Sequence, residues 1–225
     1  SGQKFDVDSE FKVKDKLLKY VSRGGLKLEK AIQSFNIKLN GCYAVDMGAS
    51  TGGFTDCMLM NGALKVYALD VGYGQLDYKL RVDPRVINME KTNIRYLDTT
   101  LIEEPIDFIS IDVSFISLRH MFPVASKILK DTGAIMCLIK PQFEAGREQV
   151  GKKGIVRDSK VHVEVIENVI GYASDNGLYP HGLDYSPVKG TKGNIEYLLY
   201  LRKTESSEKI SPQEVVNIAH GELDY

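Results

Sequence analysis

Short apolar runs alternate with amphipathic stretches along most of the chain. Runs rich in aliphatic residues predict strands at 42–45, 65–70, 86–89, 105–112, 134–140, 178–185 and 195–201. Apolar residues at helical spacing predict helices at 26–36, 55–60, 115–130 (interrupted near Pro123), 159–176 and 212–220. Near-continuous apolar runs are expected of central parallel strands, so the pattern predicts an α/β protein with helices on both faces of a mostly parallel sheet.

A glycine-rich turn at 46–54 (DMGASTGGF) joins the first predicted strand to a helix. Glycines let the backbone approach a ligand closely, and the ligand would sit on the first helical N–H groups. The turn lacks the Gly-Lys-Ser/Thr ending of a P-loop, so ATP hydrolysis is not expected. Its glycine spacing also disfavours a nicotinamide dehydrogenase. A plain connection between strand and helix is the alternative.

Two acids indicate what this turn would bind. Asp46 opens the turn, where an acid suits a cationic or amine-bearing ligand. Asp70 closes the second strand, at a position where a carboxylate accepts hydrogen bonds from ribose hydroxyls. S-adenosylmethionine carries both a ribose and an ammonium group, so the two acids favour this cofactor.

Charged residues stand at other strand ends, where the ligands of open α/β sheets collect. Asp112 ends the fourth predicted strand and Lys140 the fifth, and a lysine after a fully apolar strand is costly without a neighbouring carboxylate. Glu196 opens the last strand and Lys27 lies in the first turn of a helix, so both can reach the same mouth. The alternative is an ordinary Asp112–Lys140 ion pair with two unrelated surface charges.

Composition narrows the class of protein. The 225 residues are 43% hydrophobic and 26% charged, without an apolar stretch long enough to span a membrane, so we expect a soluble, cytoplasmic protein. The three cysteines lack metal-ligand spacing, and no metal is expected. Net charge is −1, yet residues 1–38 hold nine basic and five acidic side chains and residues 140–160 hold six and three. Such clusters are either solvated faces or local contacts for nucleic acid.

Four segments resemble the TlyA (haemolysin A) family of ribosomal-RNA methyltransferases, whose catalytic domain is similar to the FtsJ/RrmJ ribose methyltransferases. They are 20–28 (YVSRGGLKL), 46–54, 140–146 (KPQFEAG) and 186–196, which contains SPVKG and GNIE. The resemblance implies a Rossmann-like S-adenosylmethionine-dependent methyltransferase fold, with one antiparallel strand in a seven-stranded sheet. It favours a domain at 20–203 between a linker or arm at 1–19 and an acidic tail at 204–225. The family's N-terminal S4-type module is not recognisable here, so we expect a truncated protein.

The resemblance also implies residue roles. A catalytic Lys-Asp-Lys-Glu tetrad falls on Lys27, Asp112, Lys140 and Glu196. The implied cofactor residues are Asp46, Gly48, Ser50, Thr51, Gly52, Gly53, Phe54, Asp70, Val71, Asn93 and Asp112. Basic residues near the predicted mouth are expected to hold ribosomal RNA or a ribosomal subunit: Arg23, Arg147, Lys152, Lys153, Lys189 and Lys192. Tyr20 and Phe143 are candidates for base stacking, with core packing as the alternative.

Methylating a ribose 2′-hydroxyl, on cytidine by the resemblance, requires an in-line nucleophile and removal of its proton. Lys140 would act as the base if burial and the nearby Lys27 cation favour its neutral amine. Asp112 and Glu196 would orient the two lysines, and Lys27 would position the ribose or its phosphate. Two other functions stay open: a membrane-active haemolysin, which the lack of a spanning or strongly amphipathic basic segment opposes, and a non-catalytic RNA-binding or assembly module.

Overall fold

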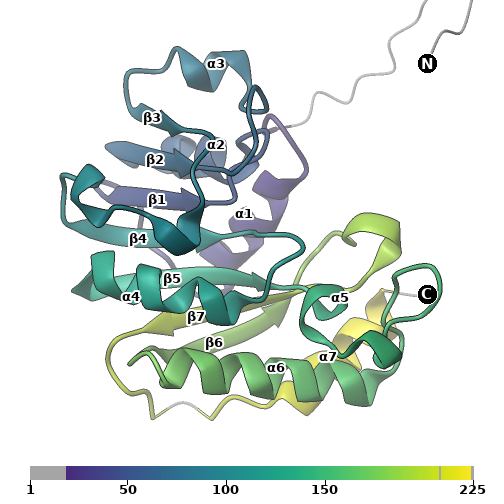
Figure 1. The fold of residues 1–225 in the computed structure, drawn as a ribbon. Coiled ribbons are helices and arrows are strands. Elements are labelled where there is room, and N and C mark those ends of the chain that lie inside the picture. The colour runs from purple at the N-terminus through teal and green to yellow at the C-terminus, as the bar shows by residue number, and fades with distance from the viewer. Residues whose placement is uncertain (1–18, 208, 224–225) are drawn as a thin grey trace, which may run out of the picture.

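The computed structural model describes residues 19–207 and 209–223, which form a seven-stranded sheet with helices on both faces (Figure 1). The strands are β1 (Tyr43–Met47), β2 (Lys65–Leu69), β3 (Val86–Met89), β4 (Ile106–Ile111), β5 (Leu129–Ile139), β6 (Tyr179–Tyr185) and β7 (Tyr197–Arg202), in the spatial order β3-β2-β1-β4-β5-β7-β6. All pairings are parallel except those of β7 with β5 and β6. The predicted fold, with one antiparallel strand, is confirmed. The predicted arm lies outside the described residues apart from Lys19.

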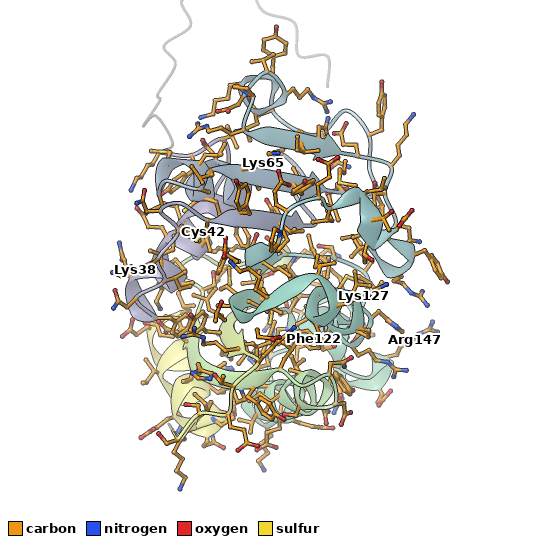
Figure 2. All side chains as sticks on the ribbon, turned by 90° about the vertical axis from the view of Figure 1, so that its left-hand side faces the viewer. Lys38, Cys42, Lys65, Phe122, Lys127 and Arg147 are labelled. Carbon is orange, nitrogen blue, oxygen red and sulfur yellow. The ribbon has the colours of Figure 1, made fainter. Side chains whose placement is uncertain are left out.

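Helices form a layer on each face of the sheet. One layer holds α1 (Gly24–Ser34), α2 (Gly53–Met60) and α3 (Tyr78–Arg81), and the other holds α4 (Phe122–Ile128), α6 (Ser159–Ser174) and α7 (Pro212–Glu222). In Figure 2, Lys38, just after α1, and Lys127 of α4 lie on opposite sides of the sheet. Successive strand residues face opposite layers, so Ala44 joins one core and Val45 the other. Two covered faces explain the near-continuous apolar runs.

Strand direction decides which loops meet at the carboxyl edge of the sheet. Met47, the last residue of β1, pairs with the last residues of β2 and β4, so the loops after these strands lie together. β7 runs the other way and therefore begins at this edge, where Tyr197 pairs with Ile139, the last residue of β5. The reversal brings Glu196, just before β7, close to Lys140, just after β5.

Several element boundaries differ from the prediction. Of the helix predicted at 115–130, the structure forms only α4 as an α-helix. Pro123 lies in the first turn of α4, where a missing N–H is tolerated, so it stands at the start of a helix and does not interrupt a longer one. β5 begins at Leu129, which pairs with Ile106 across a bulge. The segment between β5 and α6, for which no helix was predicted, contains the short helix α5 (Pro141–Glu144). In the predicted tail, α7 packs on α6 with Val216 and Ala219 buried. Among the described residues, every helix is too short or too polar to cross a bilayer.

Candidate active site

The turn between β1 and α2 lies against the end of β4. Gly48 and Gly52 have φ values of 88° and 95°, the left-handed region that favours glycine, and Ser50 shares it with a φ of 49°. A Cβ at Gly48 would lie 2.5 Å from the carbonyl oxygen of Asp112, so a side chain there would push the turn away from β4. The turn therefore presents the N-terminus of α2 at the carboxyl edge of the sheet.

Asp46 lies beneath this turn and is fully buried. One carboxylate oxygen accepts hydrogen bonds from the Thr55 amide (2.9 Å) and hydroxyl (2.7 Å), and the other accepts from the Ser110 hydroxyl (3.0 Å). Burial raises the pKa of Asp46 to about 7, against the lowering effect of these donors. The carboxylate thus holds the start of α2 to β4, and it lines neither of the cavities at the sheet edge.

Asp70 follows β2 and faces the same turn. Its two carboxylate oxygens accept hydrogen bonds from the amides of Ser50 and Gly72, each at 2.7 Å. These contacts hold the side chain in one orientation. Each carboxylate oxygen can still accept a further hydrogen bond, so the side chain can receive ligand hydroxyls.

Two adjoining cavities open at the carboxyl edge of the sheet. The first, about 350 Å³, is lined by all four residues of the predicted tetrad, and the second, about 520 Å³, is lined by Asp70, Val71 and Asn93 together with apolar side chains. Both volumes are in the range of small-molecule sites. The cavities share four lining residues: Gly48, Ser50, Asp112 and Ser114. A ligand in the second cavity can therefore reach into the first.

The predicted tetrad forms two ion pairs in the first cavity. Lys140 Nζ lies 2.5 Å from Asp112 Oδ1, a close approach of charges without the alignment of a hydrogen bond. Lys27 Nζ donates to Glu196 Oε2 at 2.6 Å. Both lysines and Glu196 are at most 9% exposed, so each pairing offsets part of the cost of burying charge. Glu196 also explains how a lysine is accommodated near the positive end of α1.

Two polar residues that the sequence did not single out contact this tetrad. Ser114 Oγ accepts a hydrogen bond from Lys140 Nζ at 3.0 Å, and Gln142 Nε2 donates to Glu196 Oε1 at 3.3 Å. Each follows a tetrad residue by two positions, Asp112 in one case and Lys140 in the other. That proximity in sequence is the one signal that could have found them.

Most of the residues predicted to bind a ligand line these cavities. The first cavity is lined by Arg23, Gly48, Ser50, Thr51, Gly53, Phe54 and Lys189 as well as the tetrad. Gly52, like Asp46, lines neither cavity, because it lies behind the turn, where a Cβ would strike Leu80 at 2.2 Å. Four of the predicted RNA-binding residues are exposed outside the cavities: Arg147, Lys152, Lys153 and Lys192.

The two candidates for base stacking differ in exposure. Tyr20 is buried, and a Cβ at Gly25 would lie 2.3 Å from the Tyr20 ring, so Tyr20 packs in the core. Phe143 is half-buried, with its ring 4.8 Å from that of Phe115, which is 90% exposed.

Comparison with known proteins identifies the family. The profile of the FtsJ-like methyltransferases matches residues 20–203. YqxC of Bacillus subtilis is 48% identical over 96% of this chain and 79% of its own length. The 16S/23S rRNA (cytidine-2′-O)-methyltransferase TlyA of Mycobacterium tuberculosis is 41% identical over 89% of this chain and 75% of its own length. A solved structure from Streptococcus thermophilus that carries a hemolysin name superposes with a TM-score of 0.89 at 52% identity, covering 93% of this chain and 77% of that one. The chain therefore belongs to the FtsJ-like methyltransferase family.

Proposed function

We propose that this chain methylates the ribose 2′-hydroxyl of ribosomal RNA, with S-adenosylmethionine as methyl donor and cytidine as the modified nucleoside. One observation carries the proposal: two lysine–carboxylate pairs line a cavity that shares a wall with a second, larger cavity. A relative bearing the name of an rRNA (cytidine-2′-O)-methyltransferase, 41% identical to this chain, indicates the acceptor.

The second cavity has the chemistry that the cofactor requires. Asp70 offers an oriented carboxylate to ribose hydroxyls, Asn93 offers a side-chain amide, and Ile94, Val113 and Met121 supply apolar walls for an adenine. Gly48 and Ser50, which also line the first cavity, would lie beside the methionine part. When bound, S-adenosylmethionine supplies a methyl group made electrophilic by its positively charged sulfur.

Lys140 is suited to remove the proton of the acceptor hydroxyl. Its amine lines the first cavity and is held by Asp112. With its amine in the neutral form, Lys140 Nζ would accept the hydroxyl proton as the oxygen bonds to the methyl carbon and the bond from that carbon to sulfur breaks, and Asp112 would stabilise the ammonium that forms. Lys27, paired with Glu196, stands in the same cavity and would hold the ribose or an adjoining phosphate oxygen. Asp46 acts indirectly, by holding the turn.

Basic side chains extend outward from the first cavity. Arg23 and Lys189 lie in its wall. The exposed Lys152 and Lys153 lie in the loop that contains Gly154, and an ideal Cβ at Gly154 would be 3.2 Å from Lys192 Nζ, so the two basic loops adjoin. We assign these residues and Arg147 to contact with the RNA backbone.

The test combines methyl transfer with cofactor binding. Wild-type protein is incubated with ribosomal subunits and labelled S-adenosylmethionine, and nucleosides from the digested RNA are identified by mass spectrometry, with 2′-O-methylcytidine as the expected product. Lys140→Met should lower turnover by at least about 100-fold, with calorimetric cofactor affinity little changed. Lys130→Met is the matched control, because it breaks a lysine–aspartate pair with Asp107 at the opposite edge of the sheet.

The outcomes separate the alternatives. Cofactor binding without methyl transfer to ribosomal RNA would favour a non-catalytic RNA-binding module and refute the proposal. A base-methylated product would assign a different acceptor atom. Equal turnover by wild type and Lys140→Met would remove Lys140 from the chemistry.

A further inference from the structure

Ser114 lies at the junction of the two cavities. It follows β4 by three residues, lines both cavities, and accepts a hydrogen bond from Lys140 Nζ at 3.0 Å. No role follows for this hydroxyl from the tetrad, since Asp112 already neutralises the lysine. Its contact with the proposed base therefore needs a separate physical explanation.

The surroundings of the Lys140 amine supply that explanation. An amine nitrogen has three positions besides its bond to Cε. Ser114 Oγ, 3.0 Å away, accepts a hydrogen bond at one of these positions, and the Asp112 carboxylate, with Oδ1 2.5 Å away but not aligned for a hydrogen bond, faces the nitrogen from a second side. The lysine side chain is 10% exposed and lines the first cavity. The third position is therefore the one left for a ligand in that cavity.

A neutral amine carries two N–H groups and one lone pair, and only the lone pair can take a proton. The negative charge of Asp112 repels the lone pair, but with no hydrogen-bond acceptor beside the amine, rotation about the Cε–Nζ bond would leave the lone pair free to face either remaining position. Ser114 Oγ, as a hydrogen-bond acceptor, draws one N–H group, and with Asp112 repelling the lone pair on a second side, the lone pair is directed into the cavity. After proton transfer, Ser114 still accepts one N–H group of the ammonium and Asp112 still faces its positive charge, so the side chain need not reorient.

The loop that carries Ser114 is fixed to the segment after Lys140. Glu144 of α5 accepts hydrogen bonds from the Ser117 hydroxyl (2.7 Å) and the Leu118 amide (2.8 Å). Between these contacts and Ser114, Phe115 has a φ of 63°, a strained conformation for a bulky residue that persists only when its surroundings impose it. Glu144 thus holds the serine and the lysine in one frame.

We propose that Ser114 is a positioning residue that directs the lone pair of Lys140 toward the acceptor hydroxyl. The proposal rests on the proposed function, in which Lys140 is the base. Loss of this hydroxyl should weaken the proton-transfer step and leave the binding of cofactor and RNA in place. Ser114→Ala removes the acceptor, and Ser114→Thr retains an oxygen at the same position. Ser126→Ala is the matched control: Ser126 lies in α4, away from the cavities, and its hydroxyl donates a hydrogen bond to the Asn176 carbonyl.

The experiment uses two independent readouts. Steady-state kinetics with ribosomal subunits should show kcat reduced about tenfold in Ser114→Ala, a part of the roughly 10²–10⁴-fold that a general base contributes. KM and calorimetric cofactor affinity should be unchanged, and Ser114→Thr should recover most of kcat. The second readout is NMR of cofactor-free protein with ¹³Cε-labelled lysine, assigned with Lys140→Arg. The motion of the Cε–Hε bonds of Lys140, measured by ¹³C relaxation, should be restricted in wild type and increase in Ser114→Ala as the amine loses its hydrogen bond to Oγ.

Each contrary result has a definite meaning. Wild-type kcat in Ser114→Ala, or an unchanged Lys140 signal, would overturn the proposal. A loss confined to cofactor affinity would also overturn it, by making Ser114 a cofactor contact. If wild type itself does not methylate RNA, the proposed function fails, and the NMR comparison still decides whether Ser114 orders Lys140.

Discussion

Gly190→Ala should slow methyl transfer about 100-fold by displacing one carboxylate. Gly190 lies in the loop before β7, and its amide donates to the Asn194 carbonyl. An ideal Cβ at this position would lie 1.9 Å from Glu196 Oε1 and 2.4 Å from Glu196 Cδ. The backbone of Gly190 is outside the left-handed region, so alanine is tolerated locally, and the side chain that must move is Glu196.

The size of the displacement follows from these contacts. Cβ atoms essentially never approach a neighbour within 3.0 Å, so a carboxylate oxygen now at 1.9 Å must shift by about 1.1 Å. Lys27 and Gln142 hold this carboxylate by hydrogen bonds of 2.6 and 3.3 Å, and both are disturbed by the shift. A misplacement of about 1 Å in an active site can cost about 100-fold in rate, or about 2.7 kcal/mol.

The assay is methyl transfer to ribosomal RNA, with thermal unfolding measured alongside. Gly190→Ala should remain folded, because the obstructing atoms belong to a side-chain tip, and should bind cofactor normally. Gly171→Ala in α6 is the matched control, since a Cβ there meets no atom within 4 Å. Wild-type turnover in Gly190→Ala would refute the reasoning that the position of Glu196 controls the rate.

Three further predictions follow from single contacts. Gln142→Leu removes one hydrogen-bond donor to Glu196, so kcat should fall. It also removes the buried Gln142 Oε1, which has no hydrogen-bond partner among the described residues, so the midpoint of urea unfolding should hold or rise. A large loss of stability would contradict this. Asp70→Asn should weaken calorimetric binding of S-adenosylmethionine by about 10–100-fold, since hydrogen bonds to a charged group contribute about 1.5–3 kcal/mol; unchanged affinity would remove Asp70 from the site. Burial lowers the pKa of His162 to about 4, so the unfolded chain binds the proton more tightly and the free energy of unfolding should decrease as pH falls from 6.5 to 4. His162→Gln should flatten this dependence, and equal slopes in urea titrations would contradict it.

Order along the chain was sufficient to predict a mostly parallel sheet with helices on both faces, and one side of the site. A strand, then Gly48, Gly52 and Gly53, then a helix is typical of the ligand-binding turn of an α/β protein. Asp70 was predicted to face the same ligand because it ends the next strand. Asp112 and Lys140 were predictable as a pair because each ends an apolar strand, and the carboxyl ends of parallel strands share an edge.

Contacts between residues far apart in sequence were decided only by the folded chain. Lys27 and Glu196 are 169 residues apart, and they meet because β7 is antiparallel and starts where β5 ends. Neither periodicity nor spacing states strand direction, so the pattern placed both residues near one mouth, and the resemblance to a family assigned them to one tetrad, but neither predicted that the two form an ion pair. The hydrogen bonds of Ser114 and Gln142 depend in the same way on how two loops pack.

Asp46 is a second case in which the sequence did not determine the contacts of a side chain. Its position at a strand end indicated an acid facing a ligand, whereas the folded chain buries it under the turn with Thr55 and Ser110 as partners. A strand residue points to one face or the other, and a shift of one position reverses its environment. Sequence can therefore place chemistry at an edge of a sheet, but packing decides which side chains face the cavity and which support it from beneath.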